Sequence, residues 1–232
     1  MYAVLFDIDG TLIRTGGAGQ LAFAQAFREE FGVEKLSGDV PFAGRSDRAI
    51  ALDLMRLHAV PPTPDHWERF RACYLRHLPA ALALRPGAVL PGVVEFIDAL
   101  EAQGGVAQGL LTGNVSAGAR AKLTHYRLAE RFAFGGFGDV ATDRAQIAAE
   151  ALSAARRHVG RLTGVDGDGD LRGVMVIGDT EHDIRCARAI DAVAVGVPTG
   201  ATPSAALAAE QPDILLDDLS DFRTLLEIVA AA

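Results

Sequence analysis

The sequence predicts an α/β fold, in which a parallel sheet carries helices on both faces. Short apolar runs of strand length occur at Tyr2–Phe6, Val106–Leu111 and Val174–Ile177, and polar residues follow each run directly. Continuous apolar runs of this kind are typical of strands that are buried on both faces. Helical patterns separate the runs, and strands that alternate with helices imply a Rossmann-like parallel sheet.

A helical segment is predicted to interrupt this pattern near the N-terminus. Apolar residues at helical spacing follow the first strand, Ser46 can cap a second helix, and Thr63 with Pro64 is a good start for a third. The breakers Arg85-Pro86-Gly87 end the segment. We therefore divide the chain into an α/β core, an all-helical insertion and the rest of the core, which comprise residues 1–14, 15–87 and 88–232.

The remaining elements continue the alternation of helix and strand. A helix striped by Val93, Ile97 and Leu100 is expected to end at Gly104, and Ser116 can cap the helix that follows the second strand. Further expected features are a short strand near 134–140, a helix capped by Thr142 that runs toward His158, a surface turn at Asp166–Asp170, and strands at 192–197 and 214–216.

Composition excludes several classes of partner. The chain of 232 residues is half hydrophobic, which is enough for a large core, but it has no run of eighteen apolar residues that could span a membrane. Its formal net charge of −8 argues against nucleic acid or an anionic membrane surface as a partner. A small anionic substrate stays possible because a bound metal can reverse the local field. We expect a monomer or a homodimer.

The cysteines and the N-terminus favour a cytoplasmic location. Cys73 and Cys186 lie far apart in the sequence and form no metal or redox pair. Two free buried thiols are the expected state in a reducing compartment. The chain enters an apolar strand at once, without the basic region and cleavage pattern of a secretory signal.

Polar side chains follow four of the predicted strands at their carboxyl ends. They are Asp7 and Asp9, Thr112 and Asn114, Asp143 and Arg144, and Asp179 and Asp183. The carboxyl ends of parallel strands meet at one edge of a sheet, where ligands bind. Each group also has a plainer interpretation, as an acidic turn, a turn hydroxyl or a helix-start carboxylate. Their coincidence at one edge favours a functional site.

Taken in order, these residues resemble the motifs of the haloacid dehalogenase-like superfamily. Asp7-Ile8-Asp9-Gly10-Thr11 resembles the first motif, Leu110-Leu111-Thr112-Gly113-Asn114 the second, and Gly178-Asp179-Thr180-Glu181-His182-Asp183 the fourth. The resemblance covers the whole chain, because the helical insertion stands where the family has its helical cap. The first and fourth motifs at the expected ends of the chain are the specific part of the match.

The resemblance implies a division of roles among these residues. Asp7 would attack phosphorus and form an aspartyl-phosphate, and Asp9 would act as the general acid and base. Magnesium would be held by Asp7, by the backbone carbonyl of Asp9 and by Asp179, with Asp183 near or in the shell. The phosphoryl oxygens would be bound by the second-motif residues Thr112, Gly113 and Asn114.

The third motif departs from the family pattern, which places a lysine there. The candidates are Arg144 and Lys122. Lys122 lies about two turns into its helix, roughly 9 Å along the axis, and is expected to point away from the pocket. Arg144 lies in the first turn of the helix that leaves the third strand, so its position favours it as the catalytic cation.

The helical cap would choose the substrate. Gly44-Arg45-Ser46 resembles an element in the caps of the phosphoglycolate phosphatase group, and Arg45 could point at an anionic group of the substrate. Its plainer interpretation is a loop arginine before an ordinary serine cap. Asp9 favours phosphate esters, because members that cleave carbon–halogen bonds lack an acid there. We therefore predict a magnesium-dependent phosphatase acting on a small phosphorylated metabolite. The alternatives are a sugar phosphomutase of the β-phosphoglucomutase type and a non-catalytic binding relative.

Overall fold

The computed structural model describes residues 1–164 and 167–232, and it contains the predicted parallel sheet. Its six strands lie in the order β5-β4-β1-β6-β7-β8, and every neighbouring pair is parallel. Their bounds are β1 Tyr2–Phe6, β4 Val106–Leu111, β5 Gly135–Gly136, β6 Gly173–Gly178, β7 Val193–Gly196 and β8 Ile214–Leu215. The predicted α/β fold is confirmed.

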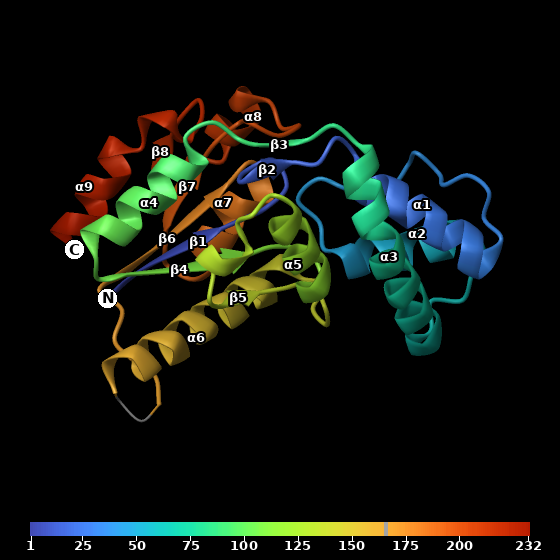
Figure 1. Cartoon of the computed structure of the whole chain (residues 1–232), viewed down its shortest axis with the longest axis horizontal. Coiled ribbons are helices and arrows are strands. Elements are labelled where there is room, and N and C mark those ends of the chain that lie inside the picture. Colours follow the sequence, from blue (N-terminus) through green and yellow to red (C-terminus); the bar gives the residue numbers. More distant parts are fainter. Residues whose placement is uncertain (165–166) are drawn as a thin grey trace.

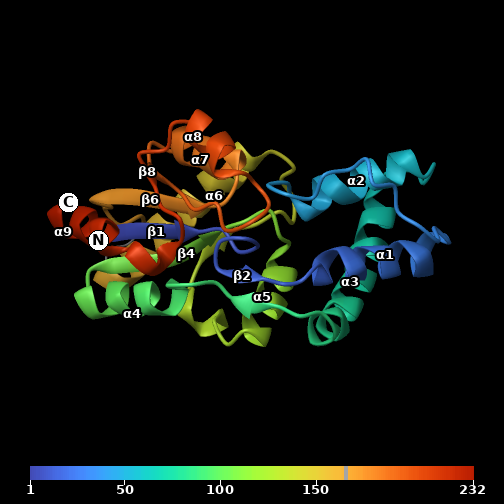
Figure 2. The ribbon, with the colours of Figure 1, turned by 90° about the horizontal axis from the view of Figure 1, so that it is seen from above.

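Helices cover both faces of this sheet (Figure 2). On one face lie α4 (Val93–Gln103) and α9 (Arg223–Ala231), and on the other lie α6 (Arg144–Thr163), α7 (Glu181–Ala189) and α8 (Ser204–Ala209). Strand β1 contributes side chains to the hydrophobic cores on both faces of the sheet, because Val4 and Phe6 belong to one cluster and Leu5 belongs to the other. Successive side chains of a strand point to opposite faces, so a fully apolar β1 is what a doubly covered sheet requires.

The helical insertion forms a cap with its own core, at the end of the molecule opposite the two termini (Figure 1). It consists of α1 (Ala18–Phe31), α2 (Asp47–Leu57) and α3 (Pro64–Leu84). The chain enters and leaves it through β2 (Ile13–Arg14) and β3 (Ala88–Val89), which pair antiparallel. The predicted helix starts are confirmed, since the Ser46 and Thr63 hydroxyls each accept a hydrogen bond from the backbone N–H three residues further on.

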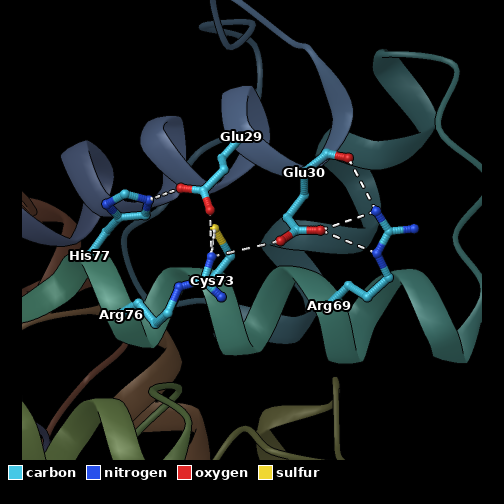
Figure 3. A network of polar contacts seen from close by, with 6 residues as sticks. All are labelled: Glu29, Glu30, Arg69, Cys73, Arg76 and His77. Carbon is cyan, nitrogen blue, oxygen red and sulfur yellow. Dashed lines mark hydrogen bonds and ion pairs between the residues drawn. The ribbon is translucent and has the colours of Figure 1, made fainter.

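A network of charged side chains joins α1 to α3 on the outer side of the cap (Figure 3). Glu29 accepts hydrogen bonds from Arg76 at 2.5 Å and pairs with His77 Nε2 at 2.7 Å. Arg69 Nε donates to Glu30 at 3.2 Å, and Arg76 also donates to the sulfur of Cys73 at 3.3 Å. We call this set of six residues the α1–α3 network.

Three local predictions were wrong in detail. The strand expected near 134–140 is only Gly135–Gly136, where a Cβ on Gly136 would lie 2.2 Å from the Ile147 carbonyl of α6. Asp143 rather than Thr142 caps α6, because its carboxylate accepts from the Ala145 N–H at 2.9 Å. Turn geometry selects one polar residue among several adjacent candidates, and the sequence pattern alone does not resolve it.

Ser116 is likewise the first residue of α5 (Ser116–His125) and not its cap. Its N–H donates to the Asp139 carboxylate at 2.8 Å, so a residue distant in sequence supplies the acceptor. Of the predicted surface turn, Asp166 lies outside the described residues.

The cysteine prediction is confirmed, since Cys73 and Cys186 are both free and buried. Among the helices of the described chain, none is both long enough and apolar enough to cross a membrane.

Candidate active site

The predicted site residues meet around a cavity of about 500 Å³ between the carboxyl edge of the sheet and the cap. Of the candidates from the sequence, those that line it are Asp7, Asp9, Arg45, Thr112, Gly113, Asn114, Arg144 and Asp179. The structure adds cap residues to the wall, among them Asp47 and Tyr74, and one core residue that was expected elsewhere, Lys122.

Three buried carboxylates, Asp7, Asp179 and Asp183, form the floor of the site, and we call them the site carboxylates. They can each present an oxygen within 4.8 Å of the others. Burial, followed by the charge of Asp183, raises the pKa of Asp7 to about 7. The same two causes raise the pKa of Asp179, to about 9. Mutual repulsion in a desolvated space makes this set a strong candidate for binding a cation.

The backbone packs tightly around Asp179 because two glycines approach it. Gly10 has a φ of +90°, and a Cβ there would lie 2.4 Å from Asp179 Oδ2. A Cβ on Gly200 would lie 1.7 Å from the same oxygen. Gly10 was part of the predicted first motif, whereas Gly200 had no recognisable signal in the sequence. Both positions require glycine if the Asp179 carboxylate is to keep its place.

Asp183 has the helix-start role that its sequence position allowed, and it also pairs with Arg144. One carboxylate oxygen accepts from the Thr180 N–H at 3.1 Å and from the Thr180 hydroxyl at 2.6 Å, which caps helix α7. The other oxygen accepts from Arg144. Both carboxylate oxygens of Asp183 therefore accept hydrogen bonds. Asp183 is suited to positioning Arg144, and it adds a negative charge beside Asp7 and Asp179.

Lys122 points into the site, so the expectation that it points away was wrong. Its Nζ donates to Asp9 Oδ2 at 2.5 Å and to Asn114 Oδ1 at 2.6 Å. The axial distance from the start of α5 was a poor guide, because side chains on a helix lean back toward its N-terminus. The long lysine side chain spans the two turns. Asn114 completes the group by donating to Asp9 at 2.9 Å and to the Thr112 hydroxyl at 2.8 Å.

Two buried cations therefore face the cavity from different sides. Lys122 donates a hydrogen bond to Asp9, and Arg144, at the start of α6, donates one to Asp183. The Arg144 side chain is 9% exposed, and its Nε has no partner among the described residues. Lys122 and Arg144 were alternative candidates for the third-motif cation, but the fold places both of them at the cavity.

Arg45 lies at the cavity wall, but its charge is already paired. Its Nη2 lies 2.5 Å from Oδ2 of Asp53, which lies about two turns into α2 and belongs to the cap itself. The carboxylate of Asp53 also accepts from Arg56 at 2.6 Å. A substrate that reached Arg45 would meet a cation that shares the single carboxylate of Asp53 with Arg56, so its charge is only partly offset.

Asp47 is a site residue that sequence reasoning missed. Its N–H donates to the Gly113 carbonyl at 2.8 Å, and its carboxylate accepts from the Val115 N–H at 2.9 Å. Burial raises the pKa of this carboxyl to about 6, although Lys122 opposes the shift. An acidic residue directly after a helix cap normally indicates only a helix start, so its sequence position gave no sign that tertiary packing would bury it.

The cap segment around Asp47 fits closely onto the core. A Cβ on Gly113 would lie 2.2 Å from the Arg45 carbonyl, and a Cβ on Gly44 would lie 2.4 Å from the ring of His182. These two glycines allow the cap loop to contact the second-motif and fourth-motif loops. Backbone contacts as well as side chains therefore hold the cap against the core beside the cavity.

A family model described as haloacid dehalogenase-like hydrolase matches residues 1–191 of the chain. The chain therefore belongs to the haloacid dehalogenase-like hydrolases, as its motifs predicted, and it is an enzyme of the hydrolase class.

Individual relatives agree with this assignment. The chain is 30% identical over 238 residues to the probable phosphatase IndB of Dickeya dadantii strain 3937, covering 99% of this chain and 92% of that protein. The fold resembles CbbY from Rhodobacter sphaeroides in complex with phosphate, with a TM-score of 0.73, 18% identity and 96% of each chain covered. It also resembles a predicted phosphoglycolate phosphatase from Haemophilus somnus 129PT, with a TM-score of 0.64, 19% identity and coverage of 99% and 98%.

Proposed function

We propose that this protein is a magnesium-dependent phosphatase that hydrolyses a small phosphate monoester through an aspartyl-phosphate. The observation that carries the proposal is that Asp7, Asp9 and Asp179 line one cavity together with the two cations Lys122 and Arg144. Asp183 lies beside Asp7 and Asp179. The similarity to a probable phosphatase over nearly the whole chain supports the same reaction class.

Asp7 is the proposed nucleophile, and Asp9 is the proposed general acid and base. The Asp7 carboxylate would attack phosphorus, and the bond from phosphorus to the ester oxygen would break. Asp9 would give a proton to that leaving oxygen and then accept one from the water that cleaves the aspartyl-phosphate, so the second step regenerates both residues. Asp9 is held for this role by the two hydrogen bonds from Lys122 and Asn114.

The phosphoryl oxygens would be bound by Thr112, Gly113 and Asn114, with Arg144 beside them. Thr112 is fully buried, and its hydroxyl accepts from both the backbone and the side chain of Asn114. This second-motif loop is therefore ordered before a substrate arrives. Fixed donors and a paired arginine stabilise a charge that develops during transfer more effectively than mobile water does.

The residues present fit magnesium. Asp7, Asp179 and the backbone carbonyl of Asp9 offer only oxygen donors, and Asp183 lies beside them. Burial and the neighbouring carboxylates raise the pKa values of Asp7 and Asp179, so a bound cation would favour their ionised forms. When bound, magnesium would offset these charges and bind a phosphoryl oxygen next to Asp7. Oxygen-only ligation disfavours softer ions such as zinc.

A phosphate-release assay tests the proposal. The protein is incubated with magnesium and small esters that include phosphoglycolate, sugar phosphates and nucleotides. We expect free phosphate from at least one ester, and no release after EDTA until magnesium is restored. Isomerised sugar phosphate without release would support the phosphomutase alternative. Absence of any turnover in a folded, magnesium-binding sample would support a non-catalytic binding protein.

A further inference from the structure

The charges of the cavity wall restrict the substrate, and they include cap residues that are separate from the phosphoryl-transfer residues. Cations in the described wall are Arg14, Arg45, Lys122 and Arg144. Lys122 faces Asp9, Arg144 faces Asp183, and Arg45 faces Asp53. Arg14 lies at the exposed rim on β2, where it donates to the Thr199 carbonyl at 3.1 Å.

Asp47 adds a buried negative charge to this wall. One of its carboxylate oxygens accepts from the Val115 N–H, and the hydrogen bonds of the described residues leave the other oxygen free. The side chain lines the same cavity as Asp7 and Asp9 but comes from the cap. A second anionic group held against the cap wall, in addition to the phosphate, would therefore meet the Asp47 carboxylate, whereas the lining cation without a carboxylate partner among the described residues, Arg14, lies at the exposed rim.

The cap wall also contains large apolar side chains, together with the polar Gln20. Phe23, Phe42, Ile50 and Tyr74 line it, and the hydroxyl of Tyr74 is buried without a partner among the described residues. A cavity of about 500 Å³ is within the range of sites that hold metabolites of moderate size. A two-carbon ester would leave most of this wall without contact.

We propose that the cavity selects phosphate monoesters whose alcohol part carries no negative charge, offers hydroxyl or amino hydrogens to Asp47, and places carbon against the apolar wall. Esters with a carboxylate or a second phosphate in the alcohol part are disfavoured, and phosphoglycolate is among them. This inference rests on the proposed phosphatase function and names the substrate class of the same site. The physical reason is that a second negative charge on the substrate would lie close to the Asp47 carboxylate in a desolvated pocket, where the two charges repel each other strongly.

Matched esters test the inference on the unmodified protein. Glycerol 1-phosphate and 3-phosphoglycerate differ by exchange of a hydroxymethyl group for a carboxylate. Fructose 6-phosphate and fructose 1,6-bisphosphate differ by one phosphate. With magnesium present, we expect kcat/KM to be at least about tenfold higher for the member of each pair that lacks the extra charge. A preference for the charged member of both pairs would overturn the inference.

The variant Asp47→Asn tests whether Asp47 causes the preference for esters without the extra negative charge. It removes the charge and keeps an oxygen to accept the Val115 N–H, so the cap loop is expected to hold its place. We expect the ratio of kcat/KM within each pair to fall at least about fivefold, chiefly through KM of the charged ester. Asp139→Asn is the matched control, because Asp139 also accepts a backbone N–H at the start of α5 but does not line the cavity.

The two levels of proposal fail in different ways. Hydrolysis of esters with an unchanged ratio in Asp47→Asn, or with the same fall in Asp139→Asn, overturns the role of Asp47 and leaves the phosphatase assignment intact. If no ester is hydrolysed at all, the proposed function fails and the inference fails with it.

Discussion

The α1–α3 network of the cap and the site carboxylates of the core both bring groups that could ligate a metal to similar distances from one another. Glu29, Cys73 and His77 offer ligand atoms within 4.8 Å of one another, as Asp7, Asp179 and Asp183 do. The Glu29 side chain is 48% exposed, whereas that of Asp183 is 1% exposed. Distances between ligand atoms therefore do not distinguish a cluster that only joins two helices from one that could bind a metal and take part in catalysis.

Burial and counter-charge make the difference. In the cap, the hydrogen bond from His77, supported by Arg76, lowers the pKa of Glu29. In the core, desolvation and neighbouring carboxylates raise the pKa values of Asp7 and Asp179. The cap cluster is already neutralised, because Arg76 donates to both Glu29 and Cys73 (Figure 3). The core cluster has an excess of negative charge, which suits it to binding a cation and a phosphate.

The largest effect is expected at Asp7. Asp7→Asn removes the proposed nucleophile and should lower kcat by about 10⁴-fold or more. Because the change also removes one of several repelling charges, the Tm without metal should stay equal or rise. Steady-state phosphate release and thermal unfolding measure the two results. Normal activity in this variant would refute the covalent mechanism.

The two buried cations can be separated by measuring activity and stability together. We expect Lys122→Ala and Arg144→Ala each to lower kcat by about 10²–10⁴-fold, since one holds Asp9 and the other faces the phosphoryl site. Arg144→Ala also leaves the fully buried Asp183 without its cation, which should cost about 3–5 kcal/mol in unfolding free energy.

Lys122→Ala should cost less stability than Arg144→Ala, because the side chain of Asp9 is 39% exposed and water can solvate it. Denaturant unfolding without metal gives the comparison. A larger stability loss for Lys122→Ala than for Arg144→Ala would contradict the inference that Asp183 depends on its cation more than Asp9 does. The variant Arg144→Lys serves as the control, and it should recover part of both losses if charge is what Asp183 requires.

A smaller effect is expected in the pH dependence of stability. Burial raises the pKa of Asp47 from 3.8 to about 6, so the folded protein binds this proton more tightly than the unfolded chain does. Stability should therefore fall as the pH rises from about 4 to 6, and the cost should be complete above that window. It amounts to at most about 3 kcal/mol.

Asp47→Asn isolates this contribution, since the amide does not titrate. The unfolding free energy of the unmodified protein minus that of the variant should decrease across the window. Lys122, Asp9 and Asp139 are the charged neighbours that modulate it. A flat difference curve would show that Asp47 keeps an ordinary pKa.

The smallest effect is expected in the α1–α3 network. Glu29→Gln removes an exposed carboxylate from pairs with Arg76 and His77, and such surface pairs contribute little and are screened by salt. We expect a small decrease in Tm that shrinks at high salt, and unchanged kcat/KM. A clear loss of activity would show that the network is coupled to the site.

The sequence predicted the fold and the main catalytic candidates because their signals are local. Apolar runs such as Tyr2–Phe6 report burial on both faces of a strand, and polar residues at strand ends report the ligand-binding edge. Less was predictable about Lys122. Its sequence position indicated a helix interior, and only the direction of the side chain and the packing of α5 reveal that it reaches Asp9.

By itself, the sequence determined the parallel sheet, the helical cap, and the grouping of Asp7, Asp9, Thr112, Arg144 and Asp179. Tertiary structure alone decided which charges are buried and which are paired. It placed Asp47 in the cavity wall and paired Arg45 with Asp53. The physical reason is that pairing and desolvation depend on segments distant in the chain, whereas strand and helix patterns depend on neighbouring residues.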